Sequence, residues 1–224
     1  MYARGVPLAK ANDDANAIAA LDEFCRKHPG HALAPDASHL QAVLEHERQR
    51  YDASADLCAA FQGKFANHAR AGDIAFLFAE NELLRSRLPE SVEKYQAFLK
   101  NYTDHAQALT ARFRMGGALF RLERYDEAKS NLEQVARGRE TDKTYRRALM
   151  MLGDIAFQQQ RWSEAASPLD DYLSFGTDQP LADDAKLKLA LALARQDKND
   201  EALKHLAELP NAFPESAHKL QATF

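Results

Sequence analysis

The residue types that could bind a metal ion or act as acid and base gather between His39 and Glu47. His46-Glu47 begins like the zinc-protease motif H-E-x-x-H, but Arg50 stands where the second histidine belongs. His39 and His46 are seven residues apart, which is about two helical turns, so both can project from one helix face beside Glu47. A metal site is one interpretation and solvated polar groups on the wall of a groove are the other; we expect the second.

Other catalytic signatures are absent from the sequence. It contains no G-x-x-x-x-G-K-[ST] loop, no G-x-G-x-x-G after a strand, no G-x-S-x-G and no Cys-x-x-Cys. His28 and His31 flank Pro29-Gly30, which prevents them from sharing a helical face. We therefore predict no catalytic residues, no cofactor and no metal, and hence a protein that is not an enzyme.

The two cysteines, Cys25 and Cys58, are too few to define a disulfide framework. Both fall on stretches that are expected to face inward. We expect two buried, small apolar side chains, and a bridge between them is the alternative.

Bulk properties narrow the class of partner. The 224 residues carry a formal net charge of -4, which gives no bulk attraction to nucleic acid or to an anionic membrane. No segment approaches the roughly 20 apolar residues that a membrane span requires. Met1 to Lys10 has neither a long apolar core nor a small-residue cleavage site, so no signal peptide is expected. We predict no nucleic-acid partner and no direct membrane insertion.

Small residues recur with a fixed period of 37 residues. One series is Gly5, Ala42, Ala79, Gly116, Gly153 and Ala190, and a second is Ala17, Ser54, Ser91, Ala128, Ala165 and Ala202. Antiparallel helices that approach to about 8 Å need small side chains where they touch. A fixed period in this range is typical of repeat proteins.

Larger apolar residues repeat in the same phase. The first series is Leu21, Cys58, Tyr95, Leu132, Leu169 and Leu206, and the second is Phe24, Phe61, Phe98, Val135, Tyr172 and Leu209. The turns repeat as Arg50-Tyr51, Arg87-Leu88, Arg124-Tyr125 and Arg161-Trp162. Together the series predict one helix-turn-helix unit that is copied along the chain.

This pattern resembles the tetratricopeptide repeat family. The residues that carry the resemblance are Met115-Gly116, Ala118, Leu119, Tyr125, Ala128 and Leu132, with Leu152-Gly153, Ala165 and Leu169 as a second copy. The family's proline after the second helix is matched by Pro29 and Pro214. The period is longer than the family's usual 34 residues. The resemblance implies an all-α fold, a right-handed α-solenoid of about six helix-turn-helix repeats, and a protein-binding function.

The period predicts a single solenoid over residues 1–224. Its expected repeats are 1–33, 34–71, 72–108, 109–145, 146–182 and 183–219, followed at 220–224 by the start of a truncated further helix. Solenoids need polar capping repeats at their ends, and neither end has one. The hypothesis is a segment of a longer array, or a protein whose ends dock on something.

Several local features refine the expected helices. Pro7 should break or delay the first helix, whereas Asp13 to Lys27 should be helical and end at His28-Pro29-Gly30. Pro89 suits the start of a second helix. Pro168 lies inside one and predicts a kink. Gly138 to Lys143 is expected to form a polar loop, and repeat six should end near Pro210 to Pro214, after which Glu215 to Phe224 begins another helix.

Stacked repeats place their first helices along a concave inner side, so groove residues follow the same period. One apolar row is Phe76, Phe113, Met150 and Leu187, and a second, seven residues further on, is Leu83, Phe120, Phe157 and Ala194. We predict that these rows bury one face of an amphipathic helix or an extended apolar peptide. Packing between neighbouring first helices is the alternative.

Charged residues flank these rows. Basic residues lie toward repeats four to six and acidic residues toward two and three: Arg114, Arg121, Arg147, Lys188 and Arg195, against Asp36, His39, Glu45, Glu47, Asp73 and Glu80. A ligand with an acidic end and an apolar body fits this polarity. The expected partner-binding residues are Phe76, Leu83, Phe113, Arg114, Phe120, Arg121, Arg147, Met150, Phe157 and Leu187.

The sequence therefore favours an interaction adaptor with a protein or peptide partner. Phe213-Pro214-Glu215-Ser216 is similar to the repeat modules of bacterial cell-envelope assembly proteins, which favours the envelope or periplasm if the chain is an excised piece, and the cytoplasm otherwise. The alternative function is a structural subunit that self-associates through its uncapped ends.

Overall fold

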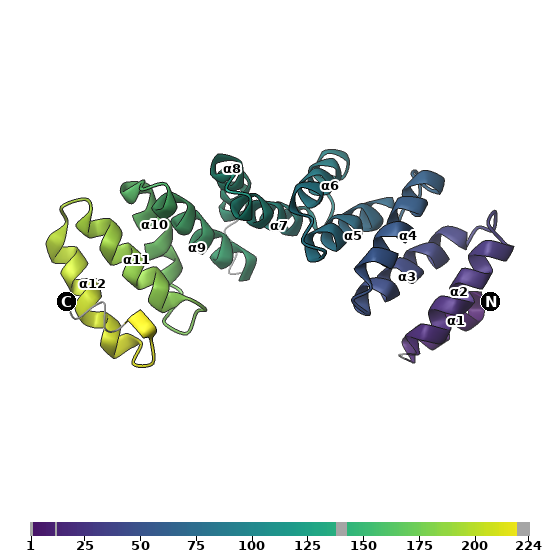
Figure 1. The fold of residues 1–224 in the computed structure, drawn as a ribbon, viewed down its shortest axis with the longest axis horizontal. Coiled ribbons are helices and arrows are strands. Elements are labelled where there is room, and N and C mark those ends of the chain that lie inside the picture. The colour runs from purple at the N-terminus through teal and green to yellow at the C-terminus, as the bar shows by residue number, and fades with distance from the viewer. Residues whose placement is uncertain (1, 12, 138–142, 219–224) are drawn as a thin grey trace. The chain divides into compact units, whose positions relative to one another are not determined.

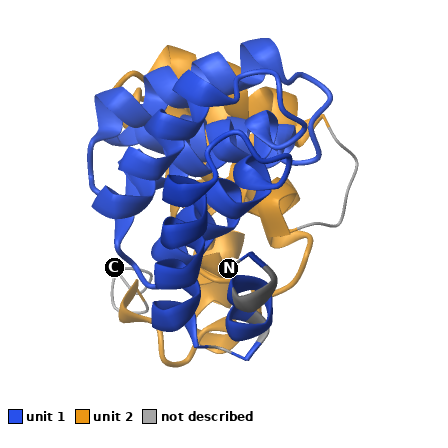
Figure 2. Ribbon diagram, turned by 90° about the vertical axis from the view of Figure 1, so that its right-hand side faces the viewer, with its two compact units in different colours: residues 1–122 blue, residues 123–224 orange. Residues whose placement is uncertain are grey.

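The computed structural model describes residues 2–11, 13–137 and 143–218. Over this part of the chain the secondary structure consists of twelve α-helices and contains no strand (Figure 1). The helices form two compact units, residues 1–122 (unit 1) and 123–224 (unit 2), which are described separately (Figure 2). No described helix is both long and apolar enough to cross a bilayer.

Unit 1 contains seven helices, in which each second helix packs against the first helix that follows it. They are α1 (Tyr2–Lys10), α2 (Asp14–Lys27), α3 (Ala34–Glu47), α4 (Tyr51–Lys64), α5 (Ala71–Leu84), α6 (Leu88–Asn101) and α7 (Ala108–Arg121). Every consecutive pair from α1 to α7 is in contact. Odd-numbered helices are the first helices of the predicted repeats, and even-numbered helices are the second ones.

Unit 2 follows the same rule with five helices. They are α8 (Tyr125–Ala136), α9 (Lys143–Gln158), α10 (Trp162–Leu173), α11 (Ala182–Ala194) and α12 (Asn199–Ala212). Consecutive helices pack on one another throughout the unit. The largest shift from the predicted repeat boundaries is at α9, which begins at Lys143 rather than at 146. The single continuous solenoid remains a prediction, because the boundary between the units falls inside the predicted fourth repeat.

Small residues permit the close approach of the two helices in a hairpin. A Cβ on Gly153 of α9 would lie 2.6 Å from both Cγ and Cδ2 of Leu169 on α10, and a Cβ on Gly5 would lie 2.9 Å from the same atoms of Leu21. Both leucines are fully buried. The predicted small positions Ala17, Ser54, Ser91, Ala165 and Ala202 are buried too. Gly116 and Ala128 lie in different units, so their predicted contact remains a prediction.

Both cysteines are free. Cys58 is fully buried in the core between α4 and α5, and burial raises the pKa of its thiol to about 12. Cys25 is half-buried, and its Sγ lies 3.7 Å from the carbonyl oxygen of Ala34. The sequence left open whether the two cysteines are buried thiols or form a bridge. In the structure both are unpaired thiols.

Three prolines lie inside helices. The expected break at Pro7 is wrong, because α1 runs through it from Tyr2 to Lys10. A proline removes only one helical hydrogen bond, and α1 is held by packing on α2, where the rings of Tyr2 and Phe24 are 5.6 Å apart. Likewise α12 continues past Pro210 to Ala212. The helix α10 contains Pro168, and its kink remains a prediction.

Other local expectations have mixed outcomes. The helix α2 ends at Lys27 with His28 as its C-cap, as predicted, and Pro89 occupies the first turn of α6. Most of the predicted loop from Gly138 to Lys143 lies outside the described residues, as does the expected helical start at 220–224.

Each described hairpin turn contains a non-glycine residue in the left-handed region. These residues are Gln49, Ser86, Glu123, Gln160 and Asp197, with φ between 56° and 61°. After Ser86, the Arg87 N–H donates to the Glu82 carbonyl oxygen at 2.9 Å, which is the bond that closes a Schellman motif. Left-handed φ costs a residue with a Cβ roughly 1–2 kcal/mol, so packing rather than local preference sets these turns.

Replacing Ser86 with glycine should raise the free energy of unfolding by about 0.5–1 kcal/mol. Glycine adopts this φ without strain, and this gain exceeds the larger entropy that glycine loses on folding. Urea denaturation followed by circular dichroism measures the change. Ser130→Gly, on the exposed side of α8, is the control and should destabilise by about 1 kcal/mol. A decrease in stability for Ser86→Gly would contradict the assigned turn conformation.

Candidate functional site

One stripe of each first helix in unit 1 is left accessible by the packing. It occupies equivalent positions of α3, α5 and α7, spaced so that all point the same way from the helix axis. We call it the first-helix face of unit 1, and its residues are half-buried or exposed: Asp36, Leu40, Val43, Glu47, Asp73, Leu77, Glu80, Leu84, Thr110, Arg114, Gly117 and Arg121.

The first predicted apolar row lies one residue before this face on every helix. Phe76 and Phe113 are buried in unit 1, and Met150 and Leu187 are buried in unit 2. The Phe76 ring packs with its centroid 5.6 Å from that of Phe98. Neighbouring residues of a helix point about 100° apart, so the side chains of this row point toward the inside of the hairpin. For these four residues the placement favours the packing alternative, and contact with a partner remains a prediction.

The second predicted row is only partly accessible. Leu83 and Phe120 are half-buried in unit 1. Phe157 is half-buried in unit 2, where its ring lies 5.2 Å from that of Trp162, and Ala194 is exposed. The row therefore borders the accessible stripe instead of forming its centre.

Predicted basic residues do lie on the accessible stripe. Arg114 and Arg121 belong to the face of unit 1, and both are exposed. The Arg114 Nε lies 3.4 Å from Glu80 Oε1, and the same carboxylate accepts a hydrogen bond from the Tyr95 hydroxyl. Burial, reinforced by the Glu80 charge, raises the pKa of Tyr95. Glu80 therefore accepts a hydrogen bond from Tyr95 and forms an ion pair with Arg114.

The large apolar side chains of the face lie on α3 and α5, which also carry its four carboxylates, and its two arginines lie on α7. Leu40 and Val43 are half-buried on α3, Leu77 is half-buried on α5, and Leu84 is 46% exposed. These two helices contact each other directly.

A polar cluster borders the face at the beginning of α5. Asp73 Oδ2 lies 3.2 Å from Arg70 Nη1, and Asp73 Oδ1 lies 3.2 Å from His105 Nε2. His39 Nε2 is 4.0 Å from the same carboxylate. Burial and, secondarily, the Arg70 charge lower the pKa of His39, although Asp73 and Asp36 oppose them. His39 is therefore a half-buried, neutral side chain on the wall of the face.

Stability should decrease in acid at His39. Its pKa in the folded chain is lowered, so below about pH 6.5 the unfolded chain takes up a proton that the folded chain resists. The stabilisation is complete above that pH and is lost as the pH falls toward the folded pKa. His39→Gln should lose less unfolding free energy between pH 7.5 and 5 in urea titrations; an unchanged or larger loss would contradict this assignment.

The corresponding face of unit 2 is less basic than predicted. Its residues on α9 and α11 are half-buried or exposed: Arg147, Met151, Asp154, Gln158, Asp184, Lys188, Leu191 and Arg195. Lys188 Nζ lies 2.6 Å from Asp154 Oδ1 and 2.6 Å from Asp184 Oδ2. These aspartates offset the lysine charge.

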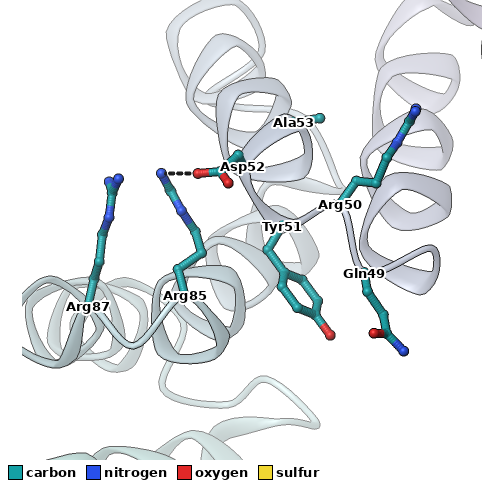
Figure 3. Close-up of a pocket in the computed structure, with 7 residues that line it drawn as sticks. All are labelled: Gln49, Arg50, Tyr51, Asp52, Ala53, Arg85 and Arg87. Carbon is teal, nitrogen blue, oxygen red and sulfur yellow. Dashed lines mark ion pairs between the residues drawn. The ribbon is translucent and has the colours of Figure 1, made fainter.

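A cleft of about 660 Å³ lies between the α3–α4 and α5–α6 turns of unit 1 (Figure 3). Arg85 and Arg87 extend into it on the same side as Asp52. Arg85 pairs with Asp52 at 2.5 Å and with Glu82 at 2.7 Å, and Arg50 pairs with the buried Glu45. Since each guanidinium faces a carboxylate, the cleft lacks the excess positive charge that an anion site requires.

The described ranges also contain no group of three or more His, Cys, Asp or Glu side chains that is arranged to hold a metal ion. The first-helix face of unit 1 combines accessible apolar side chains with exposed charge.

Two sequence models, both described as tetratricopeptide repeat, match the chain. One matches residues 76–128 and 113–180, and the other matches residues 184–216. Together the matches cover more than half of the 224 residues. The chain belongs to the tetratricopeptide repeat family. As a tetratricopeptide repeat protein it is an all-α scaffold for protein interactions, and the family is typically non-catalytic.

Solved structures of other tetratricopeptide repeat proteins share the fold. The C-terminal part of a protein from Cytophaga hutchinsonii is 19% identical, with a TM-score of 0.73 over 98% of this chain and 81% of that one. YrrB, described as a repeat protein with an unusual peptide-binding site, is 15% identical, with a TM-score of 0.72 over 91% of this chain and 97% of that one. MamA from Desulfovibrio magneticus RS-1 is 14% identical, with a TM-score of 0.66 over 82% and 97%. No curated protein matches by sequence.

Proposed function

We propose that this tetratricopeptide repeat chain is an adaptor whose first-helix face in unit 1 binds a peptide or helix of a partner protein. The partner segment presents apolar side chains to α3 and α5 and acidic side chains to α7. The observation that carries the proposal is the set of accessible apolar side chains on adjacent α3 and α5, Leu40, Val43, Leu77 and Leu84, of which Leu84 is 46% exposed. Large apolar side chains grouped with exposed charge mark interaction surfaces.

Charge supports the orientation of the segment. Arg114 is already paired with Glu80 at 3.4 Å, while Arg121 is exposed two turns further along α7. Gly117 lies between them without a side chain, so a partner backbone can approach α7 closely there. An acidic group that meets Arg121 would fix which end of the segment lies over α7.

Affinity capture with a matched pair of variants tests the apolar part. Leu84 on the face and Leu109 outside it are 46% and 49% exposed, so aspartate at either position should leave the fold intact. Leu84→Asp should abolish capture of the wild-type chain's partners, and Leu109→Asp should retain it. Equal capture by both variants, with unchanged circular dichroism, would rule out the face.

Charge reversal tests the acidic part. Arg121→Glu should weaken the captured complex at least tenfold, which corresponds to about 1.4 kcal/mol. Adding salt should weaken the wild-type complex more than the Arg121→Glu complex, because exposed charges are screened. A complex that is indifferent to both changes would remove the acidic partner from the proposal. Capture from envelope fractions rather than from cytosol tests the proposed envelope context.

A second candidate function is self-association through α12. Leu203 is 63% exposed, although the equivalent residues Ile18, Ala55 and Val92 are buried where the next first helix covers them. A second copy is the proposed occupant, since its surface continues the same kind of interface. Sedimentation should show dimers that Leu203→Asp dissociates; monomers at every concentration would exclude this function.

A further inference from the structure

Three connections between second and first helices in unit 1 are built on a histidine at the same place. His31, His68 and His105 are separated by the repeat period. In each connection the imidazole Nδ1 accepts a hydrogen bond from the backbone N–H two residues later, at 3.0 Å from Leu33, 3.2 Å from Arg70 and 3.2 Å from Gln107. Each bond lies directly before a first helix, at the point that sets where α3, α5 or α7 begins.

The same rings are held by the preceding second helix. Their centroids lie 5.3, 6.2 and 5.2 Å from those of Phe24, Phe61 and Phe98, with interplanar angles of 73°, 73° and 78°. The backbone repeats as well: each histidine's carbonyl oxygen accepts from the N–H three residues on, at 2.8 to 2.9 Å. The ring thus ties the end of one hairpin to the beginning of the next.

This geometry requires one protonation state. An Nδ1 that accepts from a backbone N–H carries a lone pair, so the proton of the neutral ring is on Nε2. Protonation places a hydrogen on Nδ1 against the backbone N–H, and the bond is lost. Histidine is the residue whose side chain ordinarily changes charge between pH 5 and 8.

Neighbouring groups differ among the three turns. His28, which follows α2, packs on the same Phe24 ring as His31, and the Cys25 Sγ of α2 lies 3.7 Å from the Ala34 carbonyl oxygen at the start of α3. His39 of α3 interacts electrostatically with His68, and Arg70 in the same turn contributes its backbone N–H. His105 faces Asp73 of α5 at 3.2 Å, and Tyr102 precedes it in the turn. An ion pair with Asp73 would hold a protonated His105 ring in place, so His31 and His68 are the clearer reporters.

We propose that His31 and His68 make the joints before α3 and α5 acid-sensitive, so that protonation opens these two turns and loosens the first-helix face. The inference concerns the turns themselves and holds whether or not that face binds the proposed partner.

Unit 2 makes the equivalent bond with a hydroxyl in place of an imidazole. At the equivalent position Ser216 accepts the N–H of His218 through its Oγ at 3.0 Å, and Gln179 occupies the preceding equivalent position. A hydroxyl makes the same bond but does not titrate in this range. The remaining equivalent, residue 142, lies outside the described residues.

Amide hydrogen exchange of the full chain, followed by NMR between pH 7.5 and 5.5, tests the proposal. Protection factors corrected for intrinsic exchange should fall about tenfold at the N–H groups of Leu33 and Arg70, since one proton changes an equilibrium up to tenfold per pH unit. Constant protection at Leu33 and Arg70 would overturn the proposal without any mutation.

Serine variants separate the imidazole from other acid effects. His31→Ser and His68→Ser copy the bond that Ser216 makes, so the amides of Leu33 and Arg70 should stay protected at both pH values. His39→Gln removes the other titrating group near His68 and should leave the fall at Arg70 unchanged. A fall that persists in His68→Ser, or that disappears in His39→Gln, would assign the effect elsewhere.

Discussion

Replacing Asn81 with alanine is expected to lower the free energy of unfolding of unit 1 by about 3 kcal/mol. The Asn81 side chain is fully buried. Its Nδ2 donates to Ser54 Oγ at 2.8 Å, and its Oδ1 lies 2.7 Å from His46 Nδ1. Alanine leaves both partners without their bond in a buried site and also leaves a cavity. Urea denaturation, with hydrogen exchange to locate the loss in unit 1, measures the change.

A double variant follows from the repeats of the chain itself. Ala192 stands at the position equivalent to Asn81, and Ala165 at the position equivalent to Ser54; both are buried. Asn81→Ala combined with Ser54→Ala should therefore be less destabilised than the sum of the two single variants, by about 1 kcal/mol. Exposed Asn101→Ala is the control for the asparagine change and should remain within about 0.5 kcal/mol of wild type. Strict additivity would show that the buried network is not coupled.

Replacing Gly153 with alanine is expected to destabilise unit 2 by about 2 kcal/mol. The new Cβ would lie 2.6 Å from Leu169 Cγ and Cδ2, and Leu169 is fully buried, with no solvent side into which it can move. Alanine ordinarily stabilises a helix by about 1 kcal/mol relative to glycine, so the clash must exceed that gain. Differential scanning calorimetry and urea denaturation both report the change.

Gly63 on α4 is the matched control, because a Cβ there meets no atom within 4 Å. Gly63→Ala should stabilise the chain by up to about 1 kcal/mol. Stabilisation by both substitutions would mean that α9 and α10 are not in close contact at Gly153, and the hairpin register would then be wrong.

The positions of the helix pairs can be predicted from the sequence, because two closely packed helices require small side chains where they touch. Gly153 must be small for Leu169 to pack, and the same constraint acts on Gly5 against Leu21. The left-handed turn residues also recur, but Gln49 and Ser86 have no residue type in common. Their conformation follows from packing, which a sequence does not display.

The sequence indicates the accessible face only in part, because the predicted aromatic row lies one position away from it. Phe76 and Phe113 lie one residue before the face and are buried, whereas Leu77 and Arg114 lie on it. Arg114 carried the signal, because a charged residue at one position of the period marks the accessible side of the helix.

The histidine turns were missed for a different reason. His31, His68 and His105 share the period of the hairpins, so the recurrence itself was visible. Their bonds run from a ring to a backbone N–H, and such bonds depend on loop geometry that residue types alone do not specify. The pairing of Arg85 with both Asp52 and Glu82 is hidden from sequence in the same way.

Site-specific photo-crosslinking tests most directly whether the first-helix face of unit 1 is where partners bind. A photoreactive amino acid placed at Leu84, at Leu109 or at Leu203 samples three exposed leucines, only the first of which lies on the face. We expect a crosslinked partner from position 84 and none from position 109. At position 203 we expect a crosslink to a second copy of the chain. A partner that crosslinks from position 109 but not from position 84 would contradict it.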